Sequence, residues 1–214
     1  MGRTLAEILD AAARGRFPPP DGGTTVVPQL LARRDAGVIA FTAHSVVFTD
    51  EDPRWVHGTL AATDCDELAA TMNPRFLAAL MARTGRSADT VDLLTVAGPL
   101  PDAPPLELRE ITDPDHPRVS RARERRDGAR VWAADGGVVV LGRGVAGRWE
   151  AAVEVDEGVR HRGLGRTLAR AARHLVPGGE PVWAQQAAGN ARSVRAFQAA
   201  GFRPVGAEVL LTLR

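Results

Sequence analysis

Four prolines fall within seven residues, Pro99-Leu-Pro-Asp-Ala-Pro-Pro105, near the middle of this 214-residue chain. Proline fixes φ and has no backbone N–H, so this stretch can form neither the interior of a helix nor a central strand. We interpret it as a linker between two folded domains, residues 1–104 and 105–214. Each domain is long enough to bury a core of its own.

The two domains differ in charge. Residues 1–104 hold 9 Arg and 13 Asp or Glu, a net charge of −4, whereas residues 105–214 hold 18 Arg and 13 acids, a net charge of +5. A basic domain indicates an anionic partner, and a charge of this size suits a phosphorylated cofactor as well as a nucleic acid. The basic run between Arg118 and Arg130 contains no aromatic residue. We therefore interpret it as a solvated helix face and expect no nucleic-acid partner.

Absent residue types exclude several chemistries. The chain has no Lys and no Tyr, so it can hold no Walker A phosphate loop, no Lys Schiff base and no Tyr acid or base. Its one cysteine, Cys65, excludes an internal disulfide and a multi-cysteine zinc site, and we expect no metal and a reducing compartment. The sequence has no signal-peptide core and no run of 18 apolar residues, so we expect a cytoplasmic protein that does not enter a membrane.

The first domain alternates between helical and strand patterns. Apolar spacing predicts helices over Thr4–Arg16 and Pro74–Thr84 and a helical turn over Pro53–Leu60. β-Branched and aromatic residues predict one long strand or a tight pair over Val38–Thr49, and a further strand over Val91–Ala97. We expect this domain to be a small α/β lobe.

The second domain has a clearer order of elements, β-α-β-β-β-α-β-α-β. Asp135-Gly136-Gly137 has the composition of a tight turn and predicts a hairpin. The predicted strands are Leu106–Ile111, Ala129–Ala134, Val138–Val145, Trp149–Val155, Val182–Gln186 and Val205–Leu213. The predicted helices run from Pro117 to about Arg126, over Gly163–Leu175 and over Ala191–Ala200.

A glycine-rich turn, Arg160-His-Arg-Gly163-Leu-Gly165, lies between a predicted strand and a predicted helix. Such a turn directs backbone N–H groups outward, and the helix dipole adds positive potential, so together they can bind an anion. Glycine also lets a pyrophosphate come close to the backbone. The alternative interpretation is a tight strand–helix connection without a ligand. A Rossmann site is disfavoured because position 168 is Leu, where that motif requires a small residue.

With a second motif, the sequence resembles the GNAT superfamily of acyl-CoA N-acyltransferases. The pyrophosphate motif of that family is matched by Arg160, Gly163 and Gly165, and its later signature by Asn190-Ala-Arg-Ser193 and a helix that ends in Gly201-Phe202. The resemblance covers roughly residues 106–214. It implies a mixed α/β fold with a mainly antiparallel sheet flanked by helices. Residues 1–104 show neither motif and look like the non-catalytic lobe of two-lobed relatives, a degenerate half of the same fold.

The resemblance also implies how acetyl-CoA binds. Backbone groups of the strand before the turn bond the pantetheine arm, the amides of the turn hold the pyrophosphate, and Asn190 and Ser193 contact the cofactor from the other side, with Phe197 near the thioester. The cofactor-binding residues implied are Val153, Glu154, Val155, Arg160, His161, Arg162, Gly163, Leu164, Gly165, Arg166, Asn190, Ser193 and Phe197.

Two carboxylates are candidates for the catalytic base. Glu150 and Glu154 share one face of the predicted strand because side chains alternate along it. Glu150 is the better candidate, since some GNAT members carry a basic carboxylate at this distance before the motif. The alternative is that both are surface residues. Phe197 stands where many members carry a Tyr that protonates the leaving thiolate, so the acid is water, the thiolate leaves unassisted, or catalysis has been lost.

We therefore expect an acyltransferase that moves an acetyl group from acetyl-CoA to a primary amine of a small molecule or peptide, as a monomer or homodimer. The alternative is a non-catalytic module that binds acyl-CoA and regulates another activity.

Overall fold

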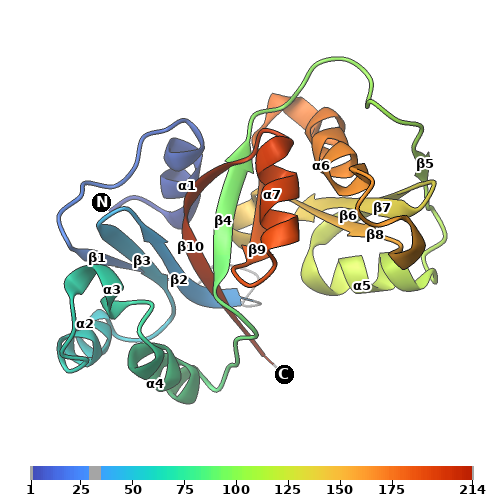
Figure 1. The fold of residues 1–214 in the computed structure, drawn as a ribbon. Helices are drawn as coiled ribbons and strands as arrows, with labels where there is room; N and C mark the ends of the chain where they lie inside the picture. Colours follow the sequence, from blue (N-terminus) through green and yellow to red (C-terminus); the bar gives the residue numbers. More distant parts are fainter. Residues whose placement is uncertain (1, 29–34, 214) are drawn as a thin grey trace. The chain divides into compact units, whose positions relative to one another are not determined.

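The computed structural model describes residues 2–28 and 35–213, which form two compact units (Figure 1). Unit 1 comprises Met1–Leu93 together with Val205–Arg214, and unit 2 comprises Leu94–Pro204. The end of the chain thus returns to unit 1. No helix within the described ranges is both long and apolar enough to cross a membrane.

Unit 1 contains strands in the order β1-β3-β2-β10. β1 runs parallel to β3, whereas β2 is antiparallel to both β3 and β10. The expected strand region over Val38–Thr49 is a tight pair that turns at Ala43, where φ is +55°. The helices are α1 (Leu5–Ala13), α2 (Pro53–Ala61), α3 (Glu67–Ala70) and α4 (Pro74–Thr84), and the strands are β1 (Thr24–Val27), β2 (Asp35–Phe41), β3 (His44–Phe48) and β10 (Arg203–Thr212).

Close strand packing explains why β10 belongs to unit 1. A side chain at Gly37 of β2 would place its Cβ 2.1 Å from the Val209 carbonyl oxygen of β10, so only glycine permits this approach. Fully buried side chains from both strands, Val38 and Leu211, then join Phe76 of α4 in one apolar cluster. Burial of such side chains stabilises the unit by about 1.5–3 kcal/mol each.

Unit 2 contains the strands in the order β4-β9-β8-β7-β6-β5. β8 is parallel to β9, and β5 to β8 are joined by antiparallel pairs. The expected mixed α/β fold with a mainly antiparallel sheet flanked by helices is therefore confirmed. The strands are β4 (Asp92–Ala97, which begins in unit 1), β5 (Arg109–Glu110), β6 (Asp127–Ala134), β7 (Gly137–Arg143), β8 (Trp149–Val155) and β9 (Val182–Ala187). The helices are α5 (Pro117–Arg125), α6 (Leu164–Leu175) and α7 (Ala191–Ala199), with 3₁₀ turns at Val145–Gly147, Glu157–Val159 and Pro177–Gly179.

The core of unit 2 fixes the position of α6. Leu168, Ala169 and Ala172 have no exposed surface and pack with Leu141 of β7 and Phe197 of α7. Alanine on the buried face of a helix lets the helix lie close to the sheet. The N-terminus of α6 is thereby held next to the end of β8.

The proline-rich stretch is not a free linker, and the boundary expected at residue 104 falls inside unit 2. The Leu100 N–H donates to the Arg173 carbonyl oxygen at 2.8 Å, and the His174 Nδ1 donates to the Pro101 carbonyl oxygen at 2.8 Å. Arg173 also donates from Nε to the Gly98 carbonyl oxygen at 2.9 Å. These bonds hold the prolines against the C-terminal end of α6.

Candidate functional site

The parallel strands β8 and β9 are paired only at their beginning. Their register joins Trp149 to Val182 and Glu150 to Trp183, and no later pair between the two strands occurs among the described residues. On its other side, β8 is paired with β7 along all of Trp149–Val155. One edge of β8 is therefore open from Ala151 onward, and an extended ligand can approach it.

The turn after β8 has the backbone conformation that the glycine motif predicts. Gly163 has φ +86° and precedes α6 as its N-cap, and His161 also has a positive φ, +69°. No side chain among the described residues caps the first N–H groups of α6. An uncapped helix N-terminus leaves N–H groups available to an anion.

The two glycines of the turn have different roles. At Gly163 only the positive φ requires glycine, because a Cβ there would meet nothing closer than Arg166 at 4.0 Å. At Gly165 a Cβ would lie 3.6 Å from Val155 and 3.9 Å from Ala196, which is ordinary van der Waals contact. Alanine therefore fits at position 165, whereas any residue with a side chain strains position 163.

The turn, the end of β8 and the start of α7 surround one cavity of about 890 Å³. Every residue predicted to bind the cofactor lines this cavity except Phe197, and the structure adds three residues that the sequence analysis missed, Arg192, Arg195 and Ala196. Their three- and four-residue helical spacing just after Asn190 was the signal that could have found them. The lining residues are Val153, Glu154, Val155, Arg160, His161, Arg162, Gly163, Leu164, Gly165, Arg166, Asn190, Arg192, Ser193, Arg195 and Ala196.

Two residues of the second motif have structural tasks in α7. Asn190 is the N-cap, and its side-chain oxygen accepts a hydrogen bond from the Ser193 N–H at 3.1 Å. Phe197 is 3% exposed and packs edge-to-face on Phe202, with ring centroids 4.9 Å apart. The structure therefore places Phe197 in the apolar core and not on the cavity wall.

Glu150 is buried, and donors surround its carboxylate. It accepts hydrogen bonds from the Arg148 Nε at 2.9 Å, the Gln185 Nε2 at 3.0 Å and the Val145 N–H at 3.3 Å, and Arg126 adds an ion pair at 3.4 Å. Burial by itself raises the pKa of Glu150, but the charges of Arg148 and Arg126 and the hydrogen bonds outweigh it and hold the pKa below its ordinary value. A carboxylate held in this way is a weak base.

A glycine makes room for this cluster. A Cβ at Gly144 would lie 2.1 Å from the carboxyl carbon of Glu150. Arg148 completes the cluster by lying over the Trp183 ring, 5.2 Å from its centroid. Sequence analysis missed Arg126 and Arg148, although the Arg148-x-Glu150 spacing along a strand puts the two side chains on one face.

Glu154 differs from Glu150 although the two share a strand face. Its side chain is 53% exposed, lines the cavity and forms an ion pair with the Arg118 Nη1 at 3.5 Å. Arg118 also donates from Nη2 to Asp156 at 3.1 Å. Arg118 of α5 therefore neutralises the one carboxylate among the residues that line the cavity.

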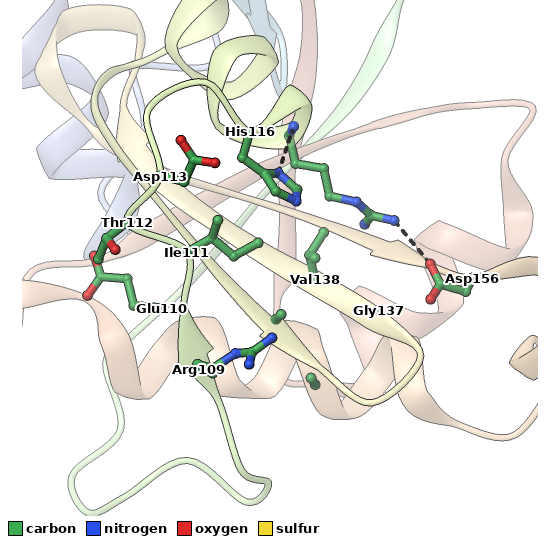
Figure 2. Close-up of a pocket in the computed structure, with 12 residues that line it drawn as sticks. Arg109, Glu110, Ile111, Thr112, Asp113, His116, Gly137, Val138 and Asp156 are labelled. Carbon is green, nitrogen blue, oxygen red and sulfur yellow. Dashed lines mark hydrogen bonds and ion pairs between the residues drawn. The ribbon is translucent and has the colours of Figure 1, made fainter.

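Arg118 and Asp156 also line a second, smaller cavity of about 400 Å³ (Figure 2). Figure 2 shows Ile111 and Val138 at its centre, Arg109 and Asp113 at its sides and Asp156 at its edge. Asp156 accepts a hydrogen bond there from the Arg118 Nη2. His116 caps α5 through its Nδ1, which accepts from the Arg118 N–H at 3.2 Å. Within the described ranges, no group of three His, Cys, Asp or Glu side chains is placed to hold a metal ion.

Comparisons with known proteins give one family model that matches part of the chain and several solved structures of low sequence identity. Residues 151–210 match the family model described as FR47-like protein. A GCN5-related N-acetyltransferase from Kribbella flavida has a similar structure, with 18% identity, a TM-score of 0.42 and coverage of 64% of this chain and 63% of that one. This chain thus spans less than two thirds of that protein. An acetyltransferase of the GNAT family from Colwellia psychrerythraea gives 9% identity, a TM-score of 0.44 and coverage of 86% and 84%.

A search of curated proteins finds no match to this chain. The matched family segment begins in β8 and extends through the glycine turn, α6, β9 and α7 into β10. It therefore contains both motifs on which the resemblance rests. Segment 151–210 is therefore similar to the FR47-like proteins, and both solved structures named above are described as N-acetyltransferases or acetyltransferases, in line with the family that the sequence resembles.

Proposed function

We propose that this protein is an acyltransferase that uses acetyl-CoA and acetylates a primary amine of a small molecule or peptide. One observation carries the proposal. The open edge of β8 and the N-terminus of α6, which follows a glycine turn and is surrounded by arginines, line the same cavity of unit 2. Acyl-CoA has the two matching parts, an amide-containing arm and a pyrophosphate.

The pyrophosphate would bind the free N–H groups at the start of α6, with Arg160, Arg162 and Arg166 adding full charges. The pantetheine arm would lie along the open edge of β8 and exchange hydrogen bonds with Val153 and Val155 as an added strand. It would run from the turn toward the fork where β8 and β9 separate. The thioester would then lie near the fork, beside Glu150 and Gln185.

At the fork, a neutral amine would attack the thioester carbon, and the C–S bond would break as the amide forms. A backbone N–H of β8 would donate to the carbonyl oxygen as it becomes negative. The amine proton would pass to water and the thiolate would take a proton from water, because Glu150 is engaged by its donors and Phe197 has no hydroxyl. Glu150 would instead hold Gln185 and the two strands in register at the fork.

Binding and turnover are tested together by measuring CoA affinity by calorimetry and thiol release from acetyl-CoA over a panel of amines and alcohols. We expect thiol release with amines. Gly163→Val should abolish CoA binding, because a β-branched residue at φ +86° costs about 1–2 kcal/mol and displaces the N–H groups. Gly158→Ala is the matched control, because Gly158 does not line the cavity and an added Cβ there would meet nothing within 4 Å; it should bind CoA as the wild type does.

Two results would contradict the proposal. Unchanged CoA affinity in a folded Gly163→Val protein would show that CoA does not use the turn. CoA binding without thiol release for any acceptor would favour the non-catalytic acyl-CoA-binding module.

A further inference from the structure

The cavity carries more positive charge than a pyrophosphate requires. Five arginines line it, three from the turn region (Arg160, Arg162, Arg166) and two from α7 (Arg192, Arg195). The carboxylate on its wall, Glu154, is already paired with Arg118. A pyrophosphate diester has two negative charges, so the turn arginines and the α6 N–H groups are sufficient for it. Arg192 and Arg195, the α7 arginine pair, remain without an assigned ligand.

The geometry of α7 directs this pair to one place. Positions 192 and 195 are three residues apart, so they lie on one face of the helix. Both side chains are exposed, and neither has an ion-pair partner in the part of the chain that the structure describes. Two guanidinium groups on one helix face, each without a carboxylate partner, are available to bind the same anion.

The α7 pair also lies next to the turn. Gly165 approaches Ala196, and a Cβ at position 165 would lie 3.9 Å from the Ala196 Cβ. Ala196 directly follows Arg195 on the cavity wall. A ligand that places its pyrophosphate on the turn can therefore reach the α7 pair with a second phosphate a few bonds away.

We propose that Arg192 and Arg195 bind the 3′-phosphate of the CoA nucleotide and make this site selective for CoA over dephospho-CoA. A phosphate monoester has close to two negative charges at neutral pH and three acceptor oxygens, which two guanidinium groups can bind in bidentate fashion. The five arginines then face about four negative charges. This inference rests on the proposed function and adds the group that selects the nucleotide.

The test compares the Kd of CoA and of dephospho-CoA, measured by calorimetry at low and high salt. We expect the wild type to bind CoA about 10- to 100-fold more tightly, the size of a charge-assisted hydrogen-bond set, and the ratio to shrink at high salt. In Arg192→Gln/Arg195→Gln the ratio should fall to about one, while the Kd of dephospho-CoA changes less than about threefold. Arg170→Gln, an exposed arginine of α6 away from the cavity lining, is the matched control and should keep the wild-type ratio.

The outcomes separate this inference from the proposed function. If the wild type binds both ligands equally, or if the double variant keeps the wild-type ratio, the 3′-phosphate assignment is overturned and the proposed function stands. Equal weakening of both ligands in the double variant would assign the α7 pair to the pyrophosphate and also overturn it. If the wild type binds neither ligand, the proposed function fails and this inference fails with it.

Discussion

Glu150 is a carboxylate whose neighbours restrict what it can do. Two guanidinium groups, an amide and a backbone N–H surround it, and Gly144 leaves just enough room for it. In a buried ion pair of this kind, the cost of removing the charges from water offsets much of their attraction, so the net gain in stability is small. Removing one partner is still costly, because the other charges are left buried and uncompensated. Its environment therefore favours a positioning role over that of a base.

Glu150→Gln tests the two roles at the level of the residue. We expect a loss of about 3 kcal/mol in the free energy of unfolding, because Arg126 and Arg148 lose their countercharge, and a fall in turnover that follows the loss of folded protein. Thermal unfolding and kcat/KM against pH are the measurements, with Glu154→Gln as the same-face control. An unchanged Tm with a turnover lower by about 10²- to 10⁴-fold would instead identify Glu150 as the base.

At the level of elements, the site depends on one helix that is tied to one strand. Arg118 at the start of α5 forms an ion pair with Glu154 and donates a hydrogen bond to Asp156, so α5 is held to the end of β8 next to the turn. The same contact offsets the negative charge of Glu154 where an anionic cofactor would bind. The Arg118 guanidinium group therefore both holds α5 in place and offsets the charge of Glu154.

Arg118→Gln should weaken CoA binding about two- to fivefold, since the unpaired Glu154 carboxylate then repels the cofactor across a partly solvated gap. Adding Glu154→Gln should restore the affinity, because it removes the repelling charge. Arg121→Gln, an exposed arginine on the same helix, is the control and should have no effect. Unaltered Kd in Arg118→Gln, or failure of the second substitution to restore binding, would refute this coupling.

For the whole molecule, stability should depend on pH through a carboxylate of unit 1. Burial, with the charges of Glu208 and Asp89, raises the pKa of Asp92 from 3.8 to about 6. Between pH 3.8 and about pH 6, Asp92 is protonated in more of the folded molecules than of the unfolded ones. Stability is therefore lost as the pH rises through this window, and the loss is complete above about pH 6.

Asp92→Asn should remove this penalty. We expect the variant to gain about 1 kcal/mol at pH 7, a value reduced because Asp92 is only half-buried, and to gain nothing near pH 4. Urea unfolding at several pH values measures it, and Asp89→Asn is a control for the smaller charge effect. An equal gain at both pH values would show that packing, and not ionisation, is responsible.

The sequence by itself determined most of the elements and the turn, but its patterns did not predict β1 or α3. Apolar periodicity predicted α1 and α4 because their buried faces repeat with the helical period. Gly163 was recognisable because glycine between a strand and a helix lets a pyrophosphate approach the backbone. The fold class was implied by the family resemblance that the two motifs carry. The expected strand over Leu106–Ile111 contracted to Arg109–Glu110, since an edge strand next to prolines has few partners.

Only the tertiary structure decided what these elements bring together. Local patterns predicted a linker at the prolines and a boundary at residue 104, but hydrogen bonds from α6 hold the prolines within unit 2, and β10 packs on β2 of unit 1. Strand parity put Glu150 and Glu154 on one face, yet one is buried among arginines and the other lines the cavity. The burial of Glu150, the ion pair of Glu154 and the position of Arg192 and Arg195 on the cavity wall depend on residues that are distant in sequence. Spacing along the chain does not encode the distances between such residues.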